Sequence, residues 1–141
     1  MSRFLLDVNA VLALLDAQHG DHQTAREWAV RTRGARWLTC PIVQNGVVRI
    51  ASQPAYSRSL GGVAAVREAL QAFGAQRRHE FVPDDISVLD DAHVVRPDLL
   101  TPKNLTDVYL LLSPAATAYG SRRSTVGWPS MRSTVALPLS K

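Results

Sequence analysis

The sequence has very little cysteine: Cys40 is the only one among 141 residues, which excludes a disulfide within one chain. A chain without disulfides suits a reducing compartment, so we expect a cytoplasmic location. Cys40 lies in an apolar context, which favours a small core residue over a nucleophile.

Long apolar runs are absent as well. No run reaches the roughly 18 residues that cross a bilayer, and the N-terminus lacks the pattern of a secretory signal. We therefore expect no membrane segment. The composition is nevertheless 46% hydrophobic, which is typical of a globular protein, and 141 residues suit one domain.

Negative charge is missing from the end of the chain. Residues 113–141 contain four Lys/Arg and no Asp/Glu, whereas residues 1–112 contain twelve of each. The formal net charge of +4 therefore lies entirely in the tail, and it does not mark the main body as a nucleic-acid binder. The neutral body and the lack of a helix-turn-helix pattern argue against a DNA-binding protein.

Residues 3–15 carry the first candidate site residue. An apolar run typical of a strand buried on both faces of a parallel sheet leads into helix-forming residues, and Asp7 stands where the strand should end. Ligands of open α/β sheets bind beyond the carboxyl ends of the strands, and an unpaired buried carboxylate is costly, so Asp7 is a candidate metal ligand. The stretch alone slightly favours an alternative, in which Asp7 or Asn9 caps the following helix.

Periodicity and turn residues predict the remaining elements. Helices are expected over 22–32, 41–52 and 63–75, and strands over 37–40 and 80–83. A further helix should open with Thr101 as its cap and Pro102 at its first position. The apolar stripe of the 63–75 helix is expected to pack in the core, with a dimer contact as the alternative.

Two polar clusters could be interpreted as metal sites, but their sequence context does not favour this. His19 and His22 are three residues apart in a polar turn, which better fits a solvated helix start. The acids at 84, 85, 90 and 91 predict a helix start and a solvated face, because their spacing misses the calcium-loop pattern.

Two other polar residues occupy positions predicted to face inward. Gln44 precedes Val47 and Val48 by three and four residues, and Asp107 has the same relation to the apolar positions 110 and 111. A buried Gln44 would need a hydrogen-bond partner. With Asp7, these residues form an oxygen-rich set of the kind that binds Mg²⁺, a cation that can activate water for phosphodiester hydrolysis.

The set carries a resemblance to a known family. The segments FLLDVN at 4–9, TCPIVQNGVVR at 39–49 and LTD at 105–107 resemble, in order and spacing, the PIN-domain ribonucleases, specifically the VapC toxins of bacterial toxin–antitoxin pairs. The resemblance covers residues 3–112. It implies an α/β fold, a three-layer α/β/α sandwich around a mainly parallel sheet, in a single PIN-like domain over 1–141.

The resemblance also implies a function. It implies Mg²⁺- or Mn²⁺-dependent cleavage of RNA, with Asp7, Gln44 and Asp107 as catalytic residues and Asp7 and Asp107 as the metal ligands. Asn9 or Thr106 would support them. The implied partners are the RNA substrate, a cognate VapB-type antitoxin and a second copy of the chain in a homodimer.

Two departures from the family pattern keep an alternative open. The family usually has Glu where this chain has Gln44, and it carries a further acid after the helix of Asp107, whereas no Asp or Glu follows Asp107 here. The alternative is a catalytically impaired PIN-fold variant that acts only as an antitoxin-binding or dimerising module.

The tail over 113–141 departs from the family pattern. Ser113-Pro114 interrupts the preceding helix, and Ser, Thr, Arg and Pro become frequent, so we expect an irregular C-terminal part. An altered reading frame is the favoured explanation, and a divergent but genuine C-terminus is the alternative.

Overall fold

The computed structural model describes residues 3–56 and 60–113; the predicted tail beyond Ser113 lies outside the described residues. The elements follow in the order β1 (Arg3–Leu5), α1 (Val8–Leu15), α2 (His22–Arg31), β2 (Arg36–Thr39), α3 (Pro41–Ala51), α4 (Val63–Gly74), β3 (His79–Phe81), a 3₁₀ helix (Pro97–Leu99) and α5 (Leu105–Leu112). Within these ranges, no helix has the length and apolar character needed to cross a membrane.

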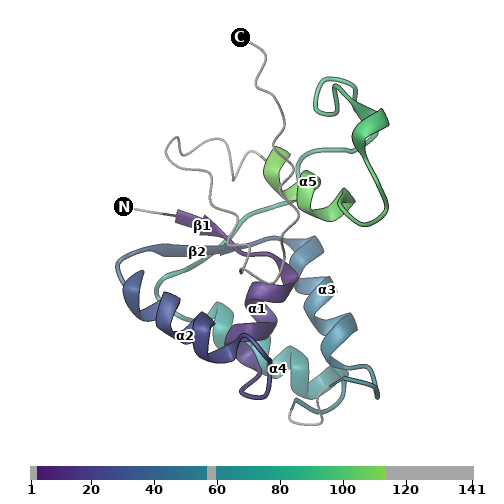
Figure 1. Ribbon diagram of the computed structural model, residues 1–141. Coiled ribbons are helices and arrows are strands. Elements are labelled where there is room, and N and C mark those ends of the chain that lie inside the picture. The colour runs from purple at the N-terminus through teal and green to yellow at the C-terminus, as the bar shows by residue number, and fades with distance from the viewer. Residues whose placement is uncertain (1–2, 57–59, 114–141) are drawn as a thin grey trace.

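The three strands form one parallel sheet in the order β1-β2-β3. Leu5 pairs with Leu38, and Thr39 pairs with Phe81, so all three carboxyl ends meet at one edge. Figure 1 shows α1, α2 and α4 on one side of the sheet and α5 on the other. The predicted α/β class with a parallel sheet is confirmed, and the arrangement is PIN-like.

The core forms where the helices meet the sheet. Its most buried members come from strand ends and from the inward faces of α1, α3 and α5, and they include Leu6, Val11, Leu38, Val47 and Leu110, each at most 1% exposed. The apolar stripe of α4 belongs to it, since Val66 and Phe73 are buried. The expectation that this stripe packs in the core is therefore confirmed for these two residues, whereas Val63 at the start of the helix is 56% exposed.

The last helix begins later than predicted. Helix α5 starts at Leu105 with Asn104 at its cap, so the prediction of Pro102 at the first helical position is wrong. The Asn104 side chain accepts from the Thr101 backbone N–H at 2.7 Å, and the Thr101 hydroxyl accepts from the Asn104 N–H at 3.2 Å. These two bonds close a turn that competes with an earlier helix start.

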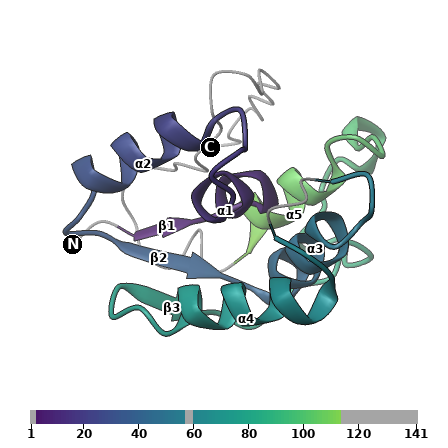
Figure 2. The same ribbon diagram turned by 90° about the horizontal axis from the view of Figure 1, so that it is seen from below.

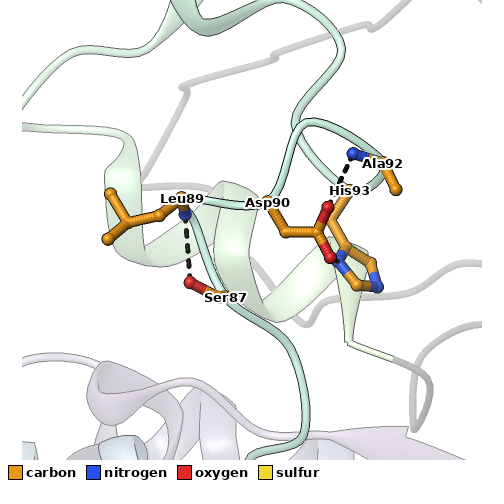
Figure 3. Close-up of polar contacts among 5 residues, drawn as sticks. All are labelled: Ser87, Leu89, Asp90, Ala92 and His93. Atoms are coloured by element: carbon orange, nitrogen blue, oxygen red, sulfur yellow. Dashed lines mark hydrogen bonds and ion pairs between the residues drawn. The ribbon is translucent and has the colours of Figure 1, made fainter.

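The acids over 84–91 do not open a helix, which is a second correction. One carboxylate oxygen of Asp90 accepts from the Ala92 N–H at 2.9 Å, and the other lies 3.1 Å from Nδ1 of His93. The Ser87 hydroxyl accepts from the Leu89 N–H at 3.1 Å (Figure 3). Short polar side chains that bond to nearby backbone favour turns over a helix, which explains the loop.

Candidate active site

Helices α1 and α3 both begin at the carboxyl edge of the sheet. The Leu6 N–H donates to the Leu38 carbonyl at 2.9 Å, which extends the β1–β2 pairing to the residue before Asp7. A Cβ on Gly46 would lie 2.7 Å from Cγ2 of Val8, so only a glycine lets the two helices approach this closely. Figures 1 and 2 place α5 beyond the same ends of the strands.

Asp7 is the N-cap of α1. Its Oδ1 accepts from the Ala10 N–H at 2.7 Å, and its backbone is extended, as a capping position requires. The capping role favoured from the sequence is confirmed. A carboxylate has about four lone-pair sites on its two oxygens, so a capping Asp7 keeps the capacity to bind a cation.

The carboxyl group of Asp7 is affected by its burial and by the charge of Asp107. Burial raises the pKa of Asp7, the negative charge of Asp107 raises it further, and hydrogen bonds from the Ala10 and Asn9 N–H groups work against the rise. The second acid therefore lies close enough to oppose ionisation of the first. Two neighbouring carboxylates of this kind suit a cation that offsets their repulsion.

Asp107 is exposed, so the prediction that it leans toward an apolar face is wrong. It lies in the first turn of α5, three residues after the cap Asn104, where a negative charge is favoured by the helix dipole. The buried face of α5 is formed by the next residues, Val108, Tyr109 and Leu110. Thr106, predicted as a supporting group, is exposed like Asp107.

Gln44 lies half-buried in the second turn of α3 and has the partner that its burial requires. Its Nε2 donates to Oγ1 of Thr39 at 3.0 Å. Since the amide nitrogen is used inside the fold, the carbonyl oxygen Oε1 is the part of the side chain that can serve the site.

Comparison with known proteins decides the family. No family model matches the chain. Ribonuclease VapC44 of Mycobacterium tuberculosis (strain ATCC 25618 / H37Rv) is 44% identical over 109 residues, which cover 77% of this chain and 76% of that protein. The chain belongs to the VapC ribonuclease family.

Two further VapC relatives from the same organism agree. Ribonuclease VapC38 is 37% identical over 107 residues, or 76% of this chain and 74% of the relative. Ribonuclease VapC39 is 31% identical over 121 residues, or 86% of both chains. The resemblance of the three sequence motifs to VapC toxins is therefore confirmed.

The donor atoms of this VapC chain fit a hard divalent cation with few protein ligands. Among residues 3–56 and 60–113, no group of three or more His, Cys, Asp or Glu side chains could hold a metal ion. Asp7 and Asp107 offer two carboxylates, and Gln44 offers an amide oxygen. Mg²⁺ keeps several waters and is commonly bound through one or two carboxylates, so the chemistry of these donors is compatible with it.

His19 and His22 connect α1 to the start of α2. His19 accepts from the Asp21 N–H through Nδ1 at 3.1 Å, so its Nε2 donates to Oδ1 of Asn9 at 3.1 Å. His22 donates through Nδ1 to the Ala13 carbonyl at 2.7 Å. His22 does begin α2, as predicted, but both side chains are half-buried, so the prediction of a solvated turn is wrong.

Asp84 is a residue of this region that the sequence analysis placed in a solvated acidic cluster and not among the site residues. Its Oδ2 accepts from the Ile42 N–H at 3.1 Å, at the start of α3, where Cys40 provides no side-chain cap. Burial, followed by the charge of Asp84 and a hydrogen bond to it, raises the pKa of Tyr109 to about 12. Asp84 thus supports the start of α3. Its place just after β3 was the available signal, because the same strand-edge argument had selected Asp7.

Cys40 lies at the same edge and is a core residue, as predicted. It is 1% exposed, and burial raises the pKa of its thiol to about 11. The thiol is therefore protonated at neutral pH and is a poor nucleophile.

Proposed function

We propose that this VapC chain is a metal-dependent endoribonuclease toxin that hydrolyses RNA phosphodiester bonds with Mg²⁺ or Mn²⁺. One observation carries the proposal: the chain is 44% identical, over 77% of its length, to a protein named ribonuclease VapC44. The electrostatic proximity of Asp7 and Asp107 at the carboxyl edge of the sheet supports it.

Each site residue has a role that its environment supports. Asp7, fixed as the cap of α1, and Asp107, in the first turn of α5, would hold the divalent ion. A bound divalent ion supplies a nucleophile from water at neutral pH and offsets charge on the phosphoryl group. Gln44 would accept a hydrogen bond from water or RNA through Oε1, and Asn9, held by His19, would keep the start of α1 in place.

The alternative of a catalytically impaired module is not favoured, because the VapC relatives described above are all named ribonucleases. Its remaining support is the lack of charge at Gln44 and the absence of any Asp or Glu after Asp107 in the sequence. The RNA test below separates the two functions.

The partners and cellular setting belong to the same proposal. We expect a VapB-type antitoxin that holds the toxin inactive, a homodimer, and a cytoplasmic location for a single domain over 1–141. The core takes up Val66 and Phe73 of the apolar stripe of α4, so a dimer contact through this helix would use its exposed apolar residue Val63, which is 56% exposed.

The decisive experiment is cleavage of a panel of structured RNAs by the purified full chain. It compares Mg²⁺, Mn²⁺ and chelator, and it includes Asp7→Asn and Asp107→Asn. Asp91→Asn is the matched control, because it removes the same charge from an exposed loop position. Chelator-sensitive cleavage that only the first two changes abolish would support the proposal. Absence of cleavage in Mn²⁺ by the unmodified chain would favour the impaired module instead.

A further inference from the structure

Three side chains from three elements form a hydrogen-bonded series behind the candidate site. Gln44 of α3 donates through Nε2 to Oγ1 of Thr39 at 3.0 Å, and the same oxygen lies 2.8 Å from Nε2 of His79. Thr39 ends β2 and is 1% exposed, whereas His79 begins β3. A buried hydroxyl is costly unless it is bonded, so both contacts of Thr39 contribute to the fold.

The direction of the series follows from the Gln44 amide. Because Nε2 of Gln44 donates to Oγ1 of Thr39, that oxygen accepts on this side, and its own hydrogen is available for Nε2 of His79. A neutral imidazole has one donor and one acceptor nitrogen, so an accepting Nε2 places the proton of the ring on Nδ1.

The His79 ring is fixed by packing as well. It contacts Phe73 edge to face, with ring centroids 5.7 Å apart and an interplanar angle of 65°. Burial lowers the pKa of His79, which favours the neutral ring that the hydrogen-bond series requires.

We propose that Thr39 and His79 are positioning residues that hold the Gln44 amide with its nitrogen toward Thr39 and its carbonyl oxygen toward the candidate site. Thr39 and His79 do not contact the reacting atoms, so they act only by orienting one acceptor, the carbonyl oxygen of Gln44. The catalytic meaning of that orientation rests on the proposed ribonuclease function, whereas the orientation itself does not.

The inference explains how a neutral amide fits where the VapC family usually has Glu. A carboxylate at position 44 cannot donate to Thr39, so the Thr39 hydroxyl would donate to it instead. The hydroxyl would then need a donor on its other side, and His79 would have to carry a proton on Nε2. Residue 44 and the protonation pattern of His79 are therefore coupled through Thr39.

The first test reads the His79 ring by ¹⁵N NMR of the histidine-labelled full chain at neutral pH. We expect the Nδ1–H tautomer in the unmodified protein and a proton on Nε2 in Gln44→Glu. His19 is an internal control, because its Nδ1 accepts from Asp21 and its Nε2 carries the proton in both proteins. A His79 ring with Nε2–H in the unmodified protein, or one that does not respond to Gln44→Glu, would overturn the inference.

The second test measures RNA cleavage in a double-mutant cycle. Thr39→Val keeps the shape of the side chain and removes the hydroxyl, and we expect cleavage to fall by about 10–100-fold, as for other outer-shell groups. Thr39→Ser should retain most activity. In a Gln44→Ala background, Thr39→Val should cause no further loss, because its effect passes through Gln44. An equal loss in both backgrounds would mean a merely structural role.

The two tests separate failure of this inference from failure of the proposed function. If the unmodified chain does not cleave RNA, the ribonuclease proposal fails, and the NMR result alone decides whether Thr39 and His79 orient Gln44. If the chain cleaves RNA but the His79 tautomer is the opposite one, the function stands and the inference fails.

Discussion

Gly46 of α3 approaches Val8 of α1 so closely that a Cβ on the glycine would lie 2.7 Å from Cγ2 of the valine. Val8 directly follows the capping Asp7, and Gly46 lies two residues after Gln44. The contact therefore sets the spacing between the two helices that carry these site residues. Real Cβ atoms do not make contacts this short, so any side chain at position 46 forces a rearrangement.

We expect Gly46→Ala to destabilise the fold. Alanine in place of a helical glycine normally gains about 0.5–1 kcal/mol, whereas overpacking a core costs about 1–3 kcal/mol. The overpacking cost should exceed the gain in helix propensity, because Val8 is β-branched and has little rotamer freedom in a helix. The free energy of unfolding should therefore fall by about 1 kcal/mol. Urea unfolding measures it.

Gly34→Ala is the matched control for this change, because nothing lies within 4 Å of a Cβ at Gly34. It should leave the free energy of unfolding unchanged or slightly higher. In a Val8→Ala background, Gly46→Ala should lose most of its cost. A Gly46→Ala protein as stable as the unmodified chain would show that the α1–α3 contact is not tightly constrained.

Two substitutions of Asp7 should distinguish its contribution to stability from its contribution to metal binding. Asn caps a helix as well as Asp does, so Asp7→Asn should keep α1 intact and also relieve the repulsion from Asp107. Without metal, we expect its melting temperature to equal or exceed that of the unmodified chain. Asp7→Ala removes the cap and should cost about 1 kcal/mol.

Adding Mn²⁺ completes this comparison. A cation that binds the folded state raises its stability, by about 2.7 kcal/mol at 100 times Kd. The unmodified chain should therefore gain in melting temperature, and neither Asp7 variant should. If Mn²⁺ raises the melting temperature of Asp7→Asn as much as that of the unmodified chain, Asp7 is not a metal ligand.

The raised pKa of Asp7 also predicts a pH dependence. Above the ordinary value of 3.8, the folded state binds more protons at this group than the unfolded state does. The contribution of Asp7 to stability is therefore greatest at low pH, and it is lost as the pH rises through the folded pKa. The difference in unfolding free energy between the unmodified chain and Asp7→Asn, measured from pH 4 to 7, isolates this group. A difference that grows in favour of the unmodified chain at higher pH would contradict it.

Some of the site was predictable because it depends on local pattern. A short apolar run that ends in an acid before a helix is sufficient to place Asp7 at a strand edge and to suggest its cap. The parallel sheet follows from the alternation of strands and helices. Gln44 could be identified as inward because a polar side chain stood among the apolar positions of a predicted helix.

The rest depended on contacts between distant segments or on competing local bonds. The helix-face argument misplaced Asp107, because α5 buries only the residues after it and leaves its first turn exposed. The start of α5 was misplaced because mutual bonds between Thr101 and Asn104 close a turn first. The contact of Thr39 with His79 requires the β2–β3 register, which no short-range pattern specifies.

Asp84 should stabilise α3 from outside the helix. It accepts from the Ile42 N–H at 3.1 Å, while the N-cap residue Cys40 makes no side-chain cap bond. Asp84→Ala should lower the unfolding free energy by about 1 kcal/mol, the usual cost of a lost cap. Asp85→Ala removes the same charge from the next exposed position and should cost less. Equal losses would indicate a general charge effect rather than a cap.

Gln44→Glu should strengthen metal binding at the expense of the metal-free fold. A third acid near Asp7 and Asp107 adds like-charge repulsion, so the melting temperature without metal should fall. The same charge should tighten Mn²⁺ binding by about tenfold, or about 1.4 kcal/mol, which isothermal titration calorimetry measures directly.

Asn45→Asp is the matched control for Gln44→Glu, because it adds one negative charge at the neighbouring, exposed position of α3. It should leave Mn²⁺ affinity nearly unchanged, since a solvated charge is screened by salt. If both changes tighten binding equally, position 44 has no special relation to the metal. If Gln44→Glu alone tightens it and also raises RNA cleavage, the amide at this position limits the activity of a site that is otherwise complete.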